Sequence, residues 1–481
     1  MLSILVAHSY FLRFDEKQRR RAKPYPPLAT LQVAALLRET RHQVTLFDAM
    51  LADGIGDYHA LLDATRPKLV LLYEDNYNFL TKMCLGKMRR AACEMIASAK
   101  RSGARVIAAG SDASDAPREY LEAGADVVLR GEGLPALVAL VARLDADTSL
   151  PVEKLVAGVS AIVSAVDSTA FASRPAAPLP APPLPRSPAW DMVDVERYRA
   201  VWLDAHGYFS LNMAASRGCS FRCNWCAKPI WGNQYLQRDA SETAAEMLQL
   251  KRRYAPDHVW FADDIFGFRT DWVTAFAAAL DAGGGGVPFT IQLRADLVSQ
   301  RMARALHDAG CREVWIGAES GSQKILDAMN KGTHVAEIVA ARRMLGAEDI
   351  RVGFFLQLGY LGEDLDDILA TRDLVARARP DDVGVSVAYP LPGTKFYDLV
   401  KGQLGDKRHW QDSDDLDMMF FGTYRTEFYR MVRDLLHDHV LPGKWPSLQR
   451  RWNDLVMREA QFRRVEAAET TGTSLAAGAI S

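Results

Sequence analysis

The segment Cys219-Ser-Phe-Arg-Cys223-Asn-Trp-Cys226 contains half of the six cysteines in this chain. Three thiolates this close together cannot each bind a separate partner, so the spacing predicts that one loop holds a single metal centre. Thiolates are the usual ligands of [4Fe–4S] clusters, and such a cluster takes four ligands. The segment therefore predicts an iron–sulfur cluster with three protein ligands and one iron left open.

Two other uses of these cysteines fit less well. A structural zinc site would need a fourth ligand, and the nearest upstream histidine, His206, lies outside the usual ligand spacing. A disulfide framework is typical of short secreted chains, whereas this chain has 481 residues. We interpret Cys84, Cys93 and Cys311 as small apolar residues of the interior.

Length and charge restrict the class of protein. The chain is longer than one typical domain, and its 58 Lys and Arg nearly balance its 60 Asp and Glu. No excess of positive charge favours nucleic acid or an anionic membrane. No apolar run reaches the roughly 18 residues of a membrane helix, and the N-terminus lacks the basic region of a signal peptide. We expect a cytoplasmic protein whose partner is a small molecule or a peptide, with no nucleic acid and no membrane.

Residues 1–150 alternate between strand-like and helical patterns, which predicts an α/β domain with a doubly wound, flavodoxin-like parallel sheet. The expected strands are 2–7, 44–47, 68–73, 105–109 and 126–129. Ligands of such sheets bind beyond the carboxyl ends of the strands. The loops at 8–10, 74–77, 110–115 and 131–133 are therefore the candidate ligand loops.

Residues 151–195 are expected to form a proline-rich linker, with a short hairpin-like connection at 158–171. A second α/β rhythm at 196–404 predicts a partial (βα)6 barrel, in which chemistry gathers at the carboxyl ends of the strands. The expected strands are 209–215, 258–262, 289–293, 313–316, 352–358 and 383–387. We expect residues 405–469 to form helices that pack on the barrel, and 470–481 to form a disordered tail.

The segment from Ser216-Arg-Gly-Cys219 to Cys226, with Trp225 before the last cysteine, resembles the signature of the radical S-adenosylmethionine (SAM) enzymes. In that family the open iron binds the amino and carboxylate groups of SAM, and an electron from the cluster cleaves SAM to a 5′-deoxyadenosyl radical. The resemblance implies that Cys219, Cys223 and Cys226 hold the cluster and that Trp225 contacts SAM.

Residues that follow the next strands are similar to the SAM-binding elements of the same family. Asp263 and Asp264 are implied to accept hydrogen bonds from the SAM amino group, although capping of the following helix would explain them equally well. Arg294 is implied to pair with the SAM carboxylate or with a neighbouring acid, and a purely structural ion pair is the alternative. Glu319 is implied to accept hydrogen bonds from the ribose hydroxyls.

The segments Ala109-Gly-Ser-Asp-Ala-Ser and Leu129-Arg-Gly-Glu-Gly133 resemble the cobalamin-binding domain that precedes many radical SAM barrels. The usual Asp-x-His-x-x-Gly pattern is absent, so no histidine is assigned as an axial cobalt ligand, and His8 is interpreted as a loop residue. The resemblance implies cobalamin contacts at Gly110, Ser111, Asp112, Gly131 and Glu132.

Together these features predict a cobalamin-dependent radical SAM enzyme, with a methyltransferase acting on an unactivated carbon as the first hypothesis. The resemblance implies a flavodoxin or ferredoxin as electron donor. The same architecture resembles the anaerobic oxidative cyclase of magnesium-porphyrin synthesis, in which no methyl group is transferred. A third hypothesis is a non-catalytic corrinoid or redox sensor, which would not require the SAM-contacting residues.

Overall fold

The computed structural model describes residues 1–78, 86–164, 187–226, 233–405, 407, 416–441 and 444–464. The predicted tail at 470–481, Cys84, and the proline-rich stretch as far as residue 186 lie outside these ranges. Within them, the strands form two six-stranded sheets and one two-stranded sheet. None of the described helices has the length and apolar character needed to cross a membrane.

The first sheet lies in the N-terminal part and has the order β2-β1-β3-β4-β5-β6. Its strands are β1 (Ser3–Ala7), β2 (Gln43–Phe47), β3 (Leu69–Tyr73), β4 (Arg105–Ala109), β5 (Val127–Leu129) and β6 (Ile162–Ser164). The first five are parallel, which confirms the predicted flavodoxin-like sheet. Of the expected hairpin-like connection at 158–171, residues 165–171 lie outside the described ranges, and the described part contains β6, which pairs antiparallel with β5 at the sheet edge.

Helices cover both faces of this sheet because the strands are apolar on both sides. Ile4 and Val6 face one core, to which α2 and α8 contribute, whereas Leu5 and Ala7 face a second core with α3 and α5. The helices of this part are α1 (Glu16–Arg21), α2 (Leu28–Glu39), α3 (Ile55–Thr65), α5 (Gly86–Arg101), α6 (Ser111–Asp115), α7 (Pro117–Glu122), α8 (Leu134–Ala146) and α9 (Val152–Val156).

The second sheet is parallel throughout and follows chain order, β7-β10-β11-β12-β13-β14, which confirms the predicted partial barrel. Its strands are β7 (Ser210–Met213), β10 (His258–Phe261), β11 (Phe289–Leu293), β12 (Cys311–Glu319), β13 (Arg351–Leu358) and β14 (Asp382–Val387). The helices between and around them are α10 (Val195–His206), α11 (Ala240–Tyr254), α12 (Thr270–Ala282), α13 (Gln300–Asp308), α14 (Gln323–Ala328), α15 (Val335–Gly346), α16 (Leu365–Ala378) and α17 (Lys395–Val400).

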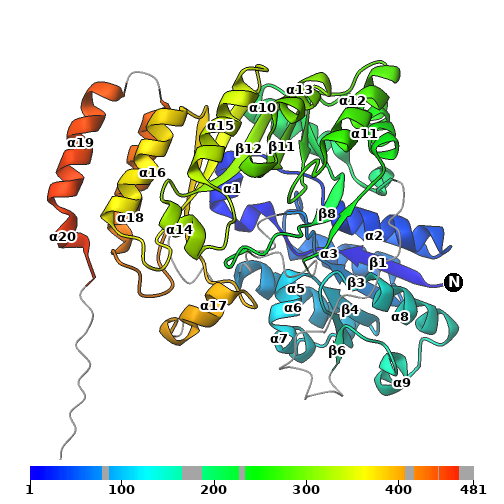
Figure 1. The fold of residues 1–481 in the computed structure, drawn as a ribbon. Helices are drawn as coiled ribbons and strands as arrows, with labels where there is room; N and C mark the ends of the chain where they lie inside the picture. Colours follow the sequence, from blue (N-terminus) through cyan, green and yellow to red (C-terminus); the bar gives the residue numbers. More distant parts are fainter. Residues whose placement is uncertain are drawn as a thin grey trace, which may run out of the picture.

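Side chains of the barrel strands alternate between two faces. On β12, Val314, Ile316 and Ala318 are completely buried in the core shared with the helices. Glu319 lies on the opposite face, which we call the inner face, and Arg294 lies near it, because Arg294 donates to the main-chain carbonyl of Lys331, whose side chain binds Glu319. Figure 1 shows this barrel in green and yellow beside the blue and cyan first sheet.

A small antiparallel pair, β8 (Ser216–Gly218) and β9 (Tyr235–Gln237), was not expected from the sequence. It comes directly before and after the cysteine segment. In Figure 1, β8 extends from the barrel toward the first sheet. The cysteine loop therefore begins on a strand that lies between the two large sheets.

The C-terminal helices are α18 (Thr426–Val440), α19 (Trp445–Met457) and α20 (Glu459–Phe462), and α18 packs against β14 and α16. Tyr424, Phe428 and Tyr429 are fully buried at this contact. These three aromatic residues thus belong to the core, whereas Phe421 is 58% exposed.

The turn between β13 and α16 buries an unusual carboxyl group, that of Glu363, which is 1% exposed. Its Oε2 accepts a hydrogen bond from the backbone N–H of Gly359, and Oε1 has no partner. Burial raises the pKa of Glu363 to about 8. The folded protein therefore keeps this carboxyl protonated at neutral pH.

We expect the ionisation of Glu363 to lower the free energy of unfolding as the pH rises. Since the folded pKa is raised, the favourable contribution is complete below about pH 4 and is lost as the pH rises through about 8, by at most about 1.4 kcal/mol per pH unit. Glu363→Gln, which is neutral at every pH, should remove this part of the slope. Urea denaturation at pH 6, 7 and 8 measures how the free energy of unfolding depends on pH, and the exposed Glu94→Gln is the control. The same pH dependence in wild type and Glu363→Gln would contradict the assignment.

Candidate functional site

The cysteine loop follows β8 and is held against the turn that follows α14. Asn224 donates from its backbone N–H to the Met329 carbonyl (2.9 Å) and from Nδ2 to the Ala328 carbonyl (2.8 Å). Asn330 Nδ2 donates in return to the Arg222 carbonyl (2.8 Å). The loop is thus fixed by backbone and amide hydrogen bonds before any ligand is considered.

The three cysteines of the loop form no disulfide, and Cys219 is buried whereas Cys223 and Cys226 are partly exposed. In the described part of the chain, no three His, Cys, Asp or Glu side chains are arranged as a ready metal site. The donor set has the thiolate chemistry of an iron–sulfur site. Its thiols share one loop but would have to converge to hold a cluster.

Arg294, at the end of β11, braces this loop from the inner face of the barrel. Its guanidinium makes two hydrogen bonds of 2.9 Å to the carboxylate of Asp296. It also lies 3.7 Å from the centre of the Phe221 ring and donates to Cys223 Sγ at 3.8 Å. The neighbouring acid expected for Arg294 is therefore Asp296, and the arginine contacts two residues of the cysteine loop.

Glu319, at the end of β12, has a left-handed backbone with φ of 60°. Such a conformation is uncommon for a residue with a side chain and is often found at functional sites. Lys331 Nζ donates to Glu319 Oε1 at 2.8 Å, and both side chains are buried. A Cβ at Gly317 would lie within 2.7 Å of both partners. The ion pair thus lies across Gly317, and sequence reasoning assigned no role to Lys331.

Asp263, at the end of β10, is fully buried and accepts hydrogen bonds from the backbone N–H of Ala215 and from Ser216 Oγ. Burial raises its pKa to about 7, against the lowering effect of these hydrogen bonds. Neither Asp263 nor Asp264 caps a helix, because α12 begins at Thr270 after Arg269. Asp263 therefore fastens the strand that leads into the cysteine loop, while Asp264 is partly exposed beside it.

Arg217, on β8, connects the cysteine loop to the first sheet. Its Nη1 donates to Glu132 Oε1 in an ion pair whose side chains are only 11% and 14% exposed. Tyr73 Oη donates to the main-chain carbonyl of Glu132 at 2.9 Å, which fixes the turn after β5. The carboxylate of Glu132 is therefore engaged by the barrel part of the chain.

The other loop residues expected at the first sheet lie at the carboxyl ends of β4 and β5. Asp112 is bound by Arg89 and by Tyr120 Oη (2.8 Å), so its carboxylate is also engaged within the domain. Ser111 begins α6, and Gly131 donates from its backbone to Ser114 Oγ at 3.0 Å. Gly110 lies over Glu74, where a Cβ would be only 2.7 Å from the glutamate side chain.

The loops after β1 and β3 contain buried polar atoms without partners. His8 Nδ1 has none, although His8 Nε2 lies 3.0 Å from Asp48 and accepts from the Ala49 N–H. Asn76, which is 0% exposed, leaves both its Oδ1 and its Nδ2 unpartnered. Buried polar groups are normally hydrogen-bonded, and in this strand order ligands bind where β1 and β3 diverge. These loops therefore fit a polar ligand, and sequence reasoning had not singled out Asn76.

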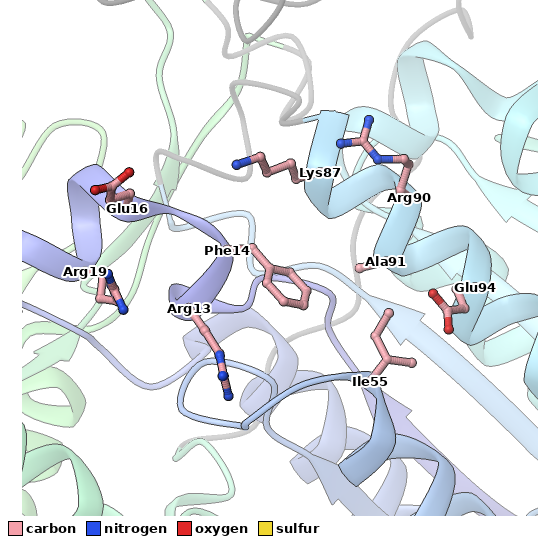
Figure 2. A pocket seen from close by; sticks show the side chains of 9 residues that line it. All are labelled: Arg13, Phe14, Glu16, Arg19, Ile55, Lys87, Arg90, Ala91 and Glu94. Carbon is pink, nitrogen blue, oxygen red and sulfur yellow. The ribbon is translucent and has the colours of Figure 1, made fainter.

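A cavity of about 580 Å³ lies elsewhere, between the segment that follows β1 and helix α5. Figure 2 shows Lys87 and Arg90 projecting from α5, and Arg13 and Phe14 on the facing segment. It shares no residue with the predicted cluster, SAM or cobalamin contacts. We therefore assign the site to the inner face of the barrel and the facing sheet edge.

Comparison with known proteins supports this location. Residues 213–375 match the model of the radical SAM superfamily. Residues 213–375 form a radical SAM domain, and the chain is an enzyme. An uncharacterized methyltransferase of Pyrococcus horikoshii is 22% identical over 381 residues, which cover 78% of each chain. An anaerobic magnesium-protoporphyrin IX monomethyl ester cyclase of Cereibacter sphaeroides is 26% identical, over 66% of this chain and 50% of the cyclase.

Solved structures share the fold around the radical SAM domain. The radical SAM methyltransferase TsrM of Kitasatospora setae, solved with cobalamin and a [4Fe–4S] cluster, superposes with a TM-score of 0.64 at 17% identity, covering 84% of this chain and 79% of TsrM. The cobalamin-dependent radical enzyme OxsB, solved with aqua-cobalamin and SAM, gives a TM-score of 0.63 at 18% identity, over 83% of this chain and 55% of OxsB. Both parts of the chain therefore share one architecture with them.

The ion pair between Glu132 and the radical SAM domain generates a prediction. Glu132→Arg or Arg217→Glu alone should lower the free energy of unfolding by about 3 kcal/mol, because each leaves like charges facing each other in a buried place. The double exchange should restore at least half of the loss. Denaturant unfolding measures it, with the exposed pair Lys401 and Asp398 exchanged as control, where less than about 1 kcal/mol is expected. Additive losses in the double variant would refute the coupling.

Proposed function

We propose that this chain is a cobalamin-dependent radical SAM methyltransferase that acts on an unactivated carbon of a small molecule or a peptide. The observation that carries the proposal is the largely buried pair Arg217–Glu132. It joins the start of the cysteine loop to the carboxyl edge of the flavodoxin-like sheet. Two ligand-binding edges on separate sheets are thereby held next to each other, as a reaction between two bound cofactors requires.

Cys219, Cys223 and Cys226 would hold a [4Fe–4S] cluster. Arg294 donates toward Cys223 Sγ and so helps to orient this thiol within the loop. When bound, the cluster supplies the electron that cleaves SAM, and cobalamin carries the methyl group.

SAM would lie on the inner face beside the cysteine loop. Glu319 keeps a carboxylate at the strand end, with Lys331 holding one of its oxygens, so the other can accept from a ribose hydroxyl. Asp264 would accept a hydrogen bond from the SAM amino group. Asp263 positions the cysteine loop through the hydrogen bonds that it accepts from Ala215 and Ser216. Trp225 has a buried Nε1 without a partner among the described residues, which supports a ligand at this side of the loop.

Cobalamin would lie at the carboxyl edge of the first sheet. The unpartnered amide of Asn76 and Nδ1 of His8 support a ligand that carries hydrogen-bonding groups. Gly110, Ser111 and Gly131 would contribute backbone contacts there, with Asp112 and Glu132 positioning these loops through Arg89 and Arg217. We also propose a flavodoxin or ferredoxin as electron donor, a cytoplasmic location, and no partnership with nucleic acid.

The cyclase alternative is a second candidate, because curated relatives include anaerobic magnesium-protoporphyrin IX monomethyl ester cyclases from Cereibacter sphaeroides (26% identity), Rubrivivax gelatinosus (24%) and Synechocystis sp. (24%). A non-catalytic sensor is disfavoured by the left-handed backbone of Glu319 and its buried ion pair with Lys331, which electron relay alone does not require.

Cys223→Ala should remove the cluster and abolish formation of 5′-deoxyadenosine from SAM, while the N-terminal sheet stays folded. Iron content, anaerobic product analysis by mass spectrometry and circular dichroism measure the three outcomes. Cys93→Ala is the matched control, because this partly exposed cysteine lies on α5, and it should retain cluster and activity. Retained SAM cleavage by Cys223→Ala would refute the cluster assignment.

The co-products separate the two candidate reactions. Protein reconstituted with iron, sulfide, hydroxocobalamin, SAM and a strong reductant should form both 5′-deoxyadenosine and S-adenosylhomocysteine, because methyl transfer leaves the demethylated compound. 5′-Deoxyadenosine without S-adenosylhomocysteine would favour the cyclase. Neither product, with an intact cluster spectrum, would leave the sensor as the remaining hypothesis.

A further inference from the structure

The inner face of the barrel carries a row of aromatic and amide side chains below the Glu319–Lys331 pair. The strand register places Gln292 beside Trp315 and Trp315 beside Gly353. One step further along β13, Phe355 lies beside Gly317 and Gly384. Neighbours in a parallel register project on the same side of a sheet, so these groups form one continuous surface.

Trp315 and Phe355 form a flat platform on this surface. Their rings stack with centroids 4.8 Å apart and planes inclined by 25°. Trp315 Nε1 donates to Glu313 Oε2 at 3.1 Å, which fixes the orientation of the indole. Both rings remain partly exposed, although they lie inside a sheet covered by helices on its other face.

Glycines make room for this platform. A Cβ at Gly353 would lie 2.6 to 2.8 Å from three carbons of the Trp315 indole, and one at Gly384 would lie 3.2 Å from Phe355. Neither glycine has a positive φ. Glycine inside a strand is unfavourable unless something approaches the backbone closely, so here the approach of the indole explains both positions.

Two amide side chains next to the platform lack hydrogen-bond partners. Gln357 follows Phe355 on the same face, about 7 Å further along the strand, and is 5% exposed with an unpartnered Oε1. Gln292 is partly exposed and makes no side-chain hydrogen bond to described residues. A buried carbonyl oxygen without a donor is costly, which indicates that a ligand supplies the donor.

The amino end of the inner face is closed by protein over β7, β10 and β11. Ser210 Oγ lies 2.9 Å from His258 Nδ1, and His258 Nε2 lies 2.8 Å from Thr290 Oγ1. Tyr25, from the N-terminal part, covers this chain of hydrogen bonds through Ser210 at 3.0 Å. Gln357 lies beyond Phe355 toward the carboxyl end of β13, so a ligand that contacts both residues lies on the side of Glu319.

We propose that the Trp315–Phe355 platform binds the substrate, and that the substrate is a flat conjugated ring compound with an N–H or O–H donor at its edge. The ring stacks on the exposed aromatic surface, and the donor binds Gln357 Oε1. The charged side chains beside the platform include two ion pairs, Glu319 with Lys331 and Glu313 with Arg351. The inference rests on the proposed function, since it places the substrate next to the proposed SAM site.

Two small probes test the proposal on the full-length reconstituted protein: indole, which has an N–H donor, and indene, which has the same shape without one. Titrations followed by ligand-observed NMR should show indole binding about fivefold to tenfold more tightly, the usual range for one hydrogen bond. Gln357→Leu should abolish this preference, and Trp315→Leu should weaken both probes tenfold or more. Phe421→Leu, at an aromatic residue that is 58% exposed, should change neither.

Circular dichroism checks that each variant folds. If Trp315→Leu does not, Trp315→Phe takes its place and should weaken both probes several-fold. Equal binding of indole and indene to the wild type, or unchanged binding in the folded variants, overturns the proposal. Formation of 5′-deoxyadenosine without the predicted probe binding would refute the platform and leave the proposed function standing. The predicted probe binding without SAM cleavage would refute the function and leave the platform as a binding site.

Discussion

The arrangement of the molecule depends on the largely buried ion pair between Arg217 and Glu132. Because both charges are largely removed from water, moving one partner away would leave the charge of the other unpaired in a low-dielectric environment. The pair therefore fixes the distance between β8 and the turn after β5, and Tyr73 fixes that turn to its own sheet. Because Arg217 comes two residues before Cys219, the position of the cysteine loop is set jointly by both α/β parts of the chain.

The loop is also held from the barrel side by contacts that do not involve its cysteine thiols. Asp263 binds the strand that enters it, Arg294 stacks on Phe221, and Asn224 and Asn330 tie it to the turn after α14. A loop that is oriented before it binds a ligand loses less conformational freedom when the ligand arrives. Only the thiols themselves have to converge, which is a local change within an otherwise supported loop.

Much of the fold could be predicted because parallel strands buried on both faces are short apolar runs between turns. The predicted strands at 105–109 and 289–293 have the observed bounds. β12 is longer than predicted, since pairing with β13 carries it through Gly317 to Glu319. β8 and β9 were missed because three residues such as Ser216-Arg-Gly have no strand preference of their own. The partners of the loop could not be predicted either, because Arg217 and Glu132 are 85 positions apart.

Glycine and strain on β12 and β13 point to the same surface. Gly317 leaves space for the Glu319–Lys331 pair, and Gly353 leaves space for the Trp315 indole. A glycine inside a strand weakens the strand. The left-handed backbone of Glu319 adds strain at the end of β12. A sheet under selection for stability alone would fill these positions with β-branched residues. Their concentration on the inner face, and the intact apolar packing of Val314 and Ile316 on the other, indicate that the inner face is shaped for ligands rather than for packing.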